Sequence, residues 1–136
     1  MYTPQITLLS SKGIIANAIV DLLPGAYGVQ LIYFSDEEVS TIIQQEADVL
    51  LKSDIIILNL SEMHVDAAAS ISLLKRLYKQ SAVLVLHLYN QKTFADAFIK
   101  MGADAYLPVN FNQEELLSVI ESVLKKKERR TIKAQL

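Results

Sequence analysis

A run of ten residues, Asp54 to Met63, constrains the fold more than any other part of the sequence. Its four consecutive aliphatic residues, Ile55 to Leu58, show no alternation of apolar and polar side chains. Such a run is typical of a strand covered on both faces, as in a parallel sheet between two layers of helices. Functional groups on such sheets lie at the carboxyl ends of the strands, so Asn59 is the first residue to consider.

The rest of the chain alternates short apolar segments with segments of helical periodicity. Strands are expected at 5–9, 29–34, 55–59, 82–88 and 105–107. Helices are expected at 14–23, 36–51 and 91–101. A further helix should lie between the loop after Met63 and Lys79, and the last helix should begin at Asn112. Crossovers between parallel strands are right-handed, which favours the strand order 2-1-3-4-5. The predicted fold is therefore α/β and flavodoxin-like, with five parallel strands and five helices in three layers.

Local signals mark several ends of these helices. Pro24-Gly25 should stop the first helix, and Gly102 fits the left-handed position after the fourth. Ser35 to Glu38 has the spacing of a capping box, and Asn112 to Glu115 offers another helix start.

Composition limits the class of protein. The 136 residues suit one domain with a real core, and the absence of cysteine excludes disulfides and thiolate chemistry. No apolar run approaches the ~20 residues of a membrane span. The N-terminus lacks the pattern of a signal peptide, so a cytoplasmic protein is expected.

Charge divides the chain into two parts. Residues 1–124 carry 7 Lys or Arg and 14 Asp or Glu, a net charge of −7, whereas residues 125–136 carry 6 and 1, a net charge of +5. We therefore expect a domain at 1–124, followed at 125–136 by a basic helix end and tail. An acidic domain is a poor nucleic-acid surface.

Three segments resemble the receiver (CheY-like) domain of two-component response regulators, over about Gln5 to Leu124. Asp54 to Met63 is similar to the strand that carries the phospho-acceptor aspartate. Ala82 to His87 is similar to the fourth strand, which ends at a switch hydroxyl. Met101-Gly-Ala-Asp-Ala-Tyr-Leu107 is similar to the family's Gly-Ala-x-x-Tyr/Phe-Leu run and is the most specific of the three.

The resemblance implies a role for single positions, and most of the expected residues are missing. The acidic pair that holds magnesium falls on Ser10 and Ser11, and the phospho-acceptor falls on Asn59. The switch hydroxyl falls on His87, and the invariant lysine falls on or near Val109. Only the aromatic switch position is kept, as Tyr106, which we expect in one fixed rotamer.

These replacements remove the chemistry of phosphorylation together. Mg²⁺ requires anionic oxygen ligands, which two hydroxyls and an amide do not supply. Asn59 lacks the carboxylate that attacks phosphorus. We therefore interpret the chain as a pseudo-receiver without enzymatic activity, metal or cofactor, and we expect Asn59 to be a strand end held by loop amide groups.

Two other groups of residues suggest binding. Ser11, Lys12 and Gly13 precede a helix, so a crevice at the ends of strands 1 and 3 could bind an anion or small ligand, although a plain turn is the simpler interpretation. His64 and His87, the only histidines, are expected at the same edge of the sheet. They could form a pH-sensitive pair or a weak metal site, but two ligands without a third make a poor site.

The predicted function is a phosphorylation-independent signalling module that acts through protein contacts. The resemblance implies a homodimer through the fourth helix, fifth strand and fifth helix, and a sensor kinase or other signalling protein as partner. DNA would be bound only by an output domain after residue 136. Candidate contact residues of mixed sign on that surface are Lys92, Asp96, Lys100, Asp104 and Glu121. The alternative is the ligand or anion sensor.

Overall fold

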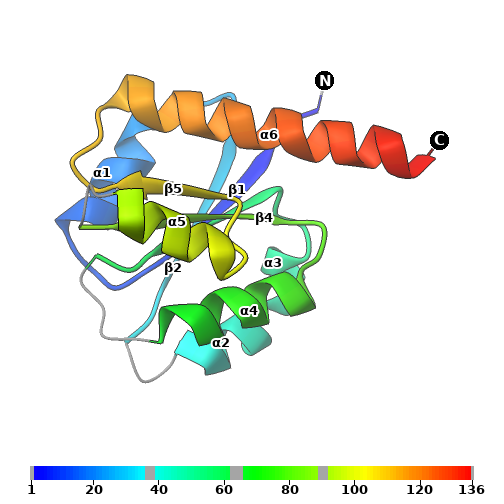
Figure 1. Ribbon diagram of the computed structural model, residues 1–136. Helices are drawn as coiled ribbons and strands as arrows, with labels where there is room; N and C mark the ends of the chain where they lie inside the picture. The colour runs from blue at the N-terminus through cyan, green and yellow to red at the C-terminus, as the bar shows by residue number, and fades with distance from the viewer. Residues whose placement is uncertain (1, 36–38, 62–65, 89–91, 136) are drawn as a thin grey trace.

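The computed structural model describes residues 2–35, 39–61, 66–88 and 92–135 (Figure 1). Five strands and six helices lie within these residues. The strands are β1 (Gln5–Ser10), β2 (Gly28–Tyr33), β3 (Ile55–Asn59), β4 (Ala82–His87) and β5 (Ala105–Pro108). The helices are α1 (Ile14–Leu22), α2 (Val39–Gln45), α3 (Ala47–Leu50), α4 (Ala67–Leu77), α5 (Lys92–Lys100) and α6 (Gln113–Gln135).

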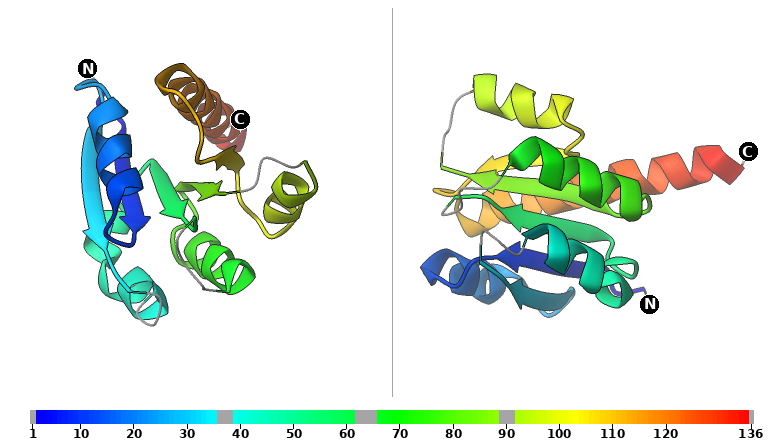
Figure 2. Two further views of the ribbon diagram at one scale, coloured as in Figure 1. Left: turned by 90° about the vertical axis from the view of Figure 1, so that its left-hand side faces the viewer. Right: turned by 90° about the horizontal axis from the view of Figure 1, so that it is seen from below.

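The strands form one parallel sheet in the order β2-β1-β3-β4-β5, which confirms the predicted topology. All four pairings are parallel, so each connection crosses over the sheet. Helices cover both faces, and Figure 2 shows the resulting three layers. The carboxyl ends of β1, β3 and β4 consequently lie side by side, as the strand order requires.

The sheet separates two hydrophobic cores. The side chains of β3 alternate between them, and Ile55 to Leu58 are all fully buried. Ile55 and Ile57 pack with residues of α1 and α6, whereas Ile56 and Leu58 pack with residues of α2 to α5. Burial on both faces explains why this strand lacks alternation in its sequence.

The expected second helix is divided into α2 and α3, so the structure has six helices where five were predicted. Glu46 lies between them with φ −92° and ψ 32°. The hydroxyl of Tyr78 donates a hydrogen bond to the carbonyl of Ile43. In a continuous α-helix this carbonyl would accept from the amide of Ala47, so the buried tyrosine competes with the helix at the break.

Helix ends follow the predicted signals where the structure describes them. The amide of Glu115 donates to Asn112 Oδ1 at 2.8 Å, and the amide of Asn112 donates to Glu115 Oε1 at 3.2 Å, which confirms a capping box at the start of α6. Gly102 follows α5 with φ 114°, as predicted. The capping box predicted from Ser35 involves residues 36–38, which lie outside the described residues.

Helix α6 continues through the boundary expected at residue 124 and ends at Gln135. Its 23 residues correspond to a length of about 34 Å, and its C-terminal part extends past the sheet (Figure 1).

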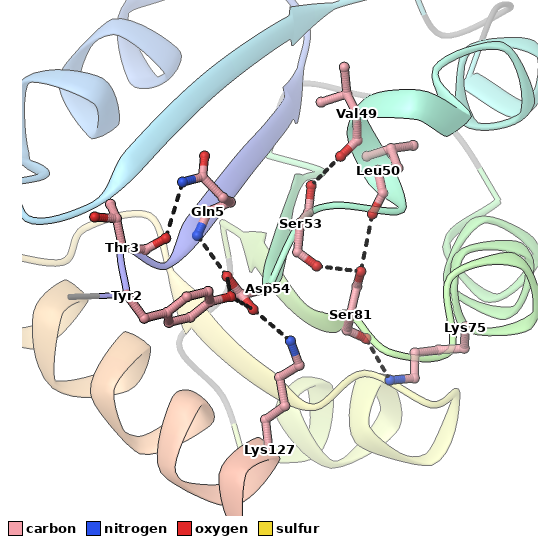
Figure 3. A network of polar contacts seen from close by, with 10 residues as sticks. All are labelled: Tyr2, Thr3, Gln5, Val49, Leu50, Ser53, Asp54, Lys75, Ser81 and Lys127. Carbon is pink, nitrogen blue, oxygen red and sulfur yellow. Dashed lines mark hydrogen bonds and ion pairs between the residues drawn. The ribbon is translucent and has the colours of Figure 1, made fainter. Parts of the chain in front are cut away.

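A polar cluster holds this helix near its middle. The buried carboxylate of Asp54 accepts hydrogen bonds from Lys127 Nζ at 2.8 Å, from the Gln5 amide at 2.8 Å and from the Tyr2 hydroxyl at 2.5 Å (Figure 3). We call Tyr2, Gln5, Asp54 and Lys127 the Asp54 cluster. It joins the N-terminal segment, the start of β3 and α6 at the amino-terminal edge of the sheet.

Candidate functional site

Three polar residues lie at the edge of the sheet where the central strands end. Ser10 is the last residue of β1, Asn59 of β3 and His87 of β4. Because β3 lies between β1 and β4, the three positions are neighbours. Ser10 and Asn59 are buried, and His87 is partly buried.

The amide of Asn59 is hydrogen-bonded at both of its polar atoms. Its Nδ2 donates to Ser10 Oγ at 3.0 Å. Its Oδ1 accepts from the Ser61 backbone amide at 3.1 Å and from Ser61 Oγ at 2.6 Å. Ser10 Oγ in turn donates to the carbonyl of Ser11 at 2.8 Å. The side chain therefore ties the ends of β1 and β3 to the loop that follows β3.

Aromatic rings surround His87 on the side of α5. The His87 ring is stacked on Phe94 at 6.4 Å between centroids, and it lies 5.5 Å from the ring of Phe98. Phe98 is stacked on Tyr106 at 5.5 Å, so a row of rings leads from β4 through α5 to β5. Burial lowers the pKa of His87 below its ordinary value. The imidazole is therefore neutral at pH 7 and packs as an aromatic ring.

The described cation of the segment after β1 lies away from Asn59. Lys12 Nζ lies over the ring of Tyr33 at 5.9 Å, and Tyr33 belongs to β2 on the side of β1 away from β3. Ser11 Oγ is buried without a hydrogen-bond partner in the part of the chain that the structure describes. Lys12 and Asn59 are thus directed to opposite sides of β1.

The residues that the structure describes hold no group of three or more His, Cys, Asp or Glu side chains that could bind a metal ion. His64, the second member of the suggested histidine pair, lies outside the described residues. Among the helices described, none is both long and apolar enough to cross a membrane.

Comparisons with known proteins find similarity in structure only. No family model matches the chain, and no curated protein matches it by sequence. The signal receiver domain of an HD domain-containing protein from Pseudomonas fluorescens aligns over 95% of this chain and 92% of its own, with 19% identity and a TM-score of 0.75. The structure has a receiver fold.

Two further solved structures share this receiver fold. NtrX from Brucella abortus aligns over 98% of this chain and 30% of its own, with 14% identity and a TM-score of 0.78. A pilus assembly-related protein from Burkholderia pseudomallei aligns over 90% of both chains, with 18% identity and a TM-score of 0.72. At such identities the likeness establishes the fold, and the role of the site depends on its own residues.

The receiver fold allows the remaining assigned positions to be located. The backbone amide of Val109, at the position assigned to the family's lysine, donates to the carbonyl of His87 at 2.9 Å, and its uncharged side chain packs against the core beside α1 and α6. Tyr106, at the aromatic switch position, is partly buried against Phe98, and burial raises its pKa. Whether Tyr106 keeps one rotamer stays a prediction.

The five candidate contact residues differ in exposure and in pairing. Lys92, Asp96 and Lys100 are exposed and lie four residues apart on one face of α5. Asp104, in contrast, forms an ion pair with Lys75 at 2.8 Å, and its side chain is only 11% exposed. Glu121 is exposed on α6, and its charge raises the pKa of Tyr27 in addition to the larger effect of burial.

Two residues that organise this edge were not anticipated from the sequence. Ser61 supplies both donors to Asn59 Oδ1, and Phe98 connects His87 with Tyr106. A serine two residues after an asparagine is a signal of side-chain-to-backbone turns and could have indicated the first. Phe94 and Phe98 are four residues apart and so lie on one helix face, but this spacing did not indicate that both rings contact His87.

Proposed function

We propose that this chain is a receiver-like regulatory module of the two-component type that works without phosphorylation, through contacts with other proteins. The observation that supports this most is the hydrogen bonding of Asn59 in a receiver fold. The amide occupies the position assigned to the phospho-acceptor, and Ser10 and Ser61 engage both of its polar atoms.

The chemistry of the site agrees with this proposal. Formation of an acyl phosphate needs a carboxylate oxygen with a free lone pair, whereas Asn59 Oδ1 belongs to an amide and already accepts two hydrogen bonds. Ser10 and Ser11 carry no charge to bind Mg²⁺. Val109 carries none to neutralise a phosphoryl group. The proposal therefore includes no catalytic step, metal or cofactor.

Helix α5 offers a surface for such contacts. Phe94 is 37% exposed, Ile99 46% and the following Met101 37%, and Lys92 and Lys100 are exposed on the same short helix. Aromatic and aliphatic side chains bordered by charges are typical of protein-binding surfaces. We infer that this surface receives a signalling partner in the cytoplasm, such as a sensor kinase or a second copy of the chain, and that residues 125–136 lead toward an output domain.

Incubation with acetyl phosphate and Mg²⁺, followed by intact-mass measurement, tests the proposal. The expected result is no change in mass under conditions that phosphorylate an ordinary receiver domain run in parallel. A gain of one phosphoryl group that is lost in Asn59→Ala would overturn it. Asn59→Asp is the matched variant, because it restores a carboxylate without restoring the acidic pair or the lysine, and we expect little or no mass gain there as well.

The buried oxygen of Ser11 favours a second candidate, an anion sensor at the start of α1. The placement of Lys12 over Tyr33 weighs against it, because the one cation of this segment lies beside β2. NMR titration with inorganic phosphate would decide between the two, since a sensor requires shifts at Ser11 to Gly13. Unchanged spectra at millimolar phosphate would exclude the anion sensor and favour the protein-contact proposal.

A further inference from the structure

Strands β1 and β2 carry polar side chains on a face that is apolar elsewhere in the sheet. Leu9 and Ile32 pack on the face of α2 to α5, and the side chains two and four residues before them point the same way. These earlier positions are polar or small. The parallel register places them side by side, Gln5 opposite Gly28 and Thr7 opposite Gln30. A sheet between two helical layers is ordinarily apolar at such positions, so this part of it has another use.

The helical layer leaves a pocket over these polar positions. Helix α3 has only four residues and ends at Leu50, and the chain then turns back through Lys52 and Ser53 to β3. A volume of about 260 Å³ remains between this segment and the two strands. We call it the α3 pocket, and its polar lining comprises Gln5, Thr7, Gln30, Asp48, Lys52 and Ser53.

Two buried hydroxyl groups in the lining are fixed in direction. Thr7 is 2% exposed and Ser53 is 4% exposed, and their oxygens are 2.6 Å apart. Figure 3 shows that Ser53 Oγ donates to the carbonyl of Val49, at 2.9 Å. Because a hydroxyl has one hydrogen, Thr7 is the donor between the two hydroxyls. Thr7 Oγ1 therefore remains able to accept a hydrogen bond from a ligand.

The side chain of Gln5 is also held in place beside the pocket. Its Nε2 donates to the carbonyl of Thr3 at 3.1 Å. A Cβ at Gly28 would lie 2.4 Å from Gln5 Oε1, so the glycine provides the space in which this amide lies across β2. The polar surface is thus built by local contacts.

The lining includes one charge of each sign. Asp48 and Lys52 are exposed and four residues apart, about one helical turn, so both can contact the same small molecule. Within the part of the chain that the structure describes, neither forms an ion pair. Asp48 would repel a phosphate bound to Lys52, and the polar lining offers little contact to an apolar ligand. The lining therefore favours a ligand that carries both charges.

We propose that the α3 pocket binds a small zwitterion of the amino-acid type. The carboxylate of the ligand pairs with Lys52, and its ammonium group pairs with Asp48 and donates to Thr7 Oγ1. The volume is below the roughly 300–1,000 Å³ of pockets for drug-sized molecules, which suits a ligand of this size.

The α3 pocket lies at the amino-terminal edge of the sheet, whereas Asn59 lies at the carboxyl-terminal edge. Gln5 belongs both to the pocket and to the Asp54 cluster. The inference therefore does not depend on the chemistry at Asn59, and it goes beyond the proposed function.

Titration of the full chain with a panel of L-amino acids, followed by NMR, tests the site. We expect saturable shifts of the backbone amides of Thr7, Gln30 and Lys52 with at least one amino acid at millimolar concentration. Acetate and methylammonium carry one charge each. They should bind about tenfold more weakly than the best amino acid, because each engages only part of the lining.

Substitutions separate the contributions of the lining residues. Lys52→Met and Asp48→Asn each remove one charge and keep much of the side chain, and each should weaken binding about tenfold. Thr7→Val should weaken it in the same direction by removing the acceptor. The matched controls are Lys126→Met and Asp21→Asn, because both residues are exposed on helices of the layer at the other face of the sheet. Both controls should bind as the original chain does.

Circular dichroism of each variant confirms folding, and the exposed positions Lys52 and Asp48 keep the test valid if Thr7→Val does not fold. The inference fails if no amino acid in the panel shifts these amides, or if acetate or methylammonium binds as tightly as the best amino acid. It also fails if Lys126→Met weakens binding as much as Lys52→Met, or if the shifts are confined to Ser11 to Gly13. A phosphoryl group on Asn59 would overturn the proposed function and leave this inference standing.

Discussion

Removal of the Asp54 carboxylate should destabilise the fold by an amount that its contacts allow to be estimated. Asp54→Ala removes three hydrogen bonds to a charged acceptor whose side chain is 10% exposed. Hydrogen bonds to charged groups contribute about 1.5–3 kcal/mol each when buried. Tyr2 is 72% exposed and Lys127 is 27% exposed, so water replaces much of what they lose. We therefore expect a loss of about 2–3 kcal/mol in the free energy of unfolding.

A double-mutant cycle isolates the part that belongs to Lys127. Lys127→Met keeps the aliphatic stem of the side chain and removes the ion pair, which should cost about 1 kcal/mol. In the Asp54→Ala background the same substitution should cost almost nothing, which gives a coupling energy of about 1 kcal/mol. Urea unfolding followed by circular dichroism measures all four proteins.

The contribution of Asp54 should also depend on pH in a defined direction. Burial alone would raise the pKa of this carboxyl, but the hydrogen bonds from Lys127, Tyr2 and the Gln5 amide outweigh it and hold the pKa below its ordinary value. A lowered pKa gives stability that is present above the unfolded value of about 3.9 and is lost as the pH falls through the folded value. The difference between the original chain and Asp54→Asn should therefore shrink below pH 4. Equal unfolding midpoints for all variants at pH 7, or a coupling energy near zero, would refute the assignment of the cluster.

Three further predictions test other parts of the account by urea unfolding. The lowered pKa of His87 means that the original chain should lose stability as the pH falls below about 6.5, and His87→Leu should remove this loss; a pH profile shared by both would exclude His87 as its source. Asn59→Asp should cost about 1–3 kcal/mol at pH 7 and less at pH 4, because a buried carboxylate is neutralised in acid; no cost at either pH would mean that Asn59 is not buried. Gly102→Ala should lower the free energy of unfolding by about 1 kcal/mol, because φ of Gly102 is 114°. Gly25→Ala is the control and should be nearly neutral, because no atom lies within 4 Å of an added Cβ. Equal effects of the two substitutions would argue against the left-handed turn.

The parts of the fold that follow from local patterns could be predicted from the sequence. The unbroken apolar run of β3 indicated a strand covered on both faces, and the alternation of strands and helices gave the order of the sheet. That order alone brought Ser10 next to Asn59, although they are 49 residues apart. The helix start predicted at Asn112 to Glu115 depended on four consecutive residues and was confirmed.

Contacts between distant residues could not be predicted, because no local pattern encodes them. The ion pair of Asp54 with Lys127 joins residues 73 positions apart, and Lys127 by sequence was one cation in a basic run. The break at Glu46 accompanies a hydrogen bond from the hydroxyl of Tyr78 to the carbonyl of Ile43. Tyr78 follows helix α4, 35 residues further along the chain. The last helix was expected to run into the basic residues after Leu124, but its continuation to Gln135 was not, because no apolar periodicity marks that part.

The alternation of β3 between two cores has a consequence for how sequence change is tolerated in this chain. Ile55 and Ile56 are adjacent and both fully buried, yet they share no packing neighbours across the sheet, since one meets α1 and α6 and the other meets the helices opposite. The interior therefore consists of two compartments that can be refilled independently. A second substitution that compensates for a change at Ile55 or Ile56 should therefore lie in the same core as the changed residue. The neighbouring isoleucine in the sequence should not compensate for it.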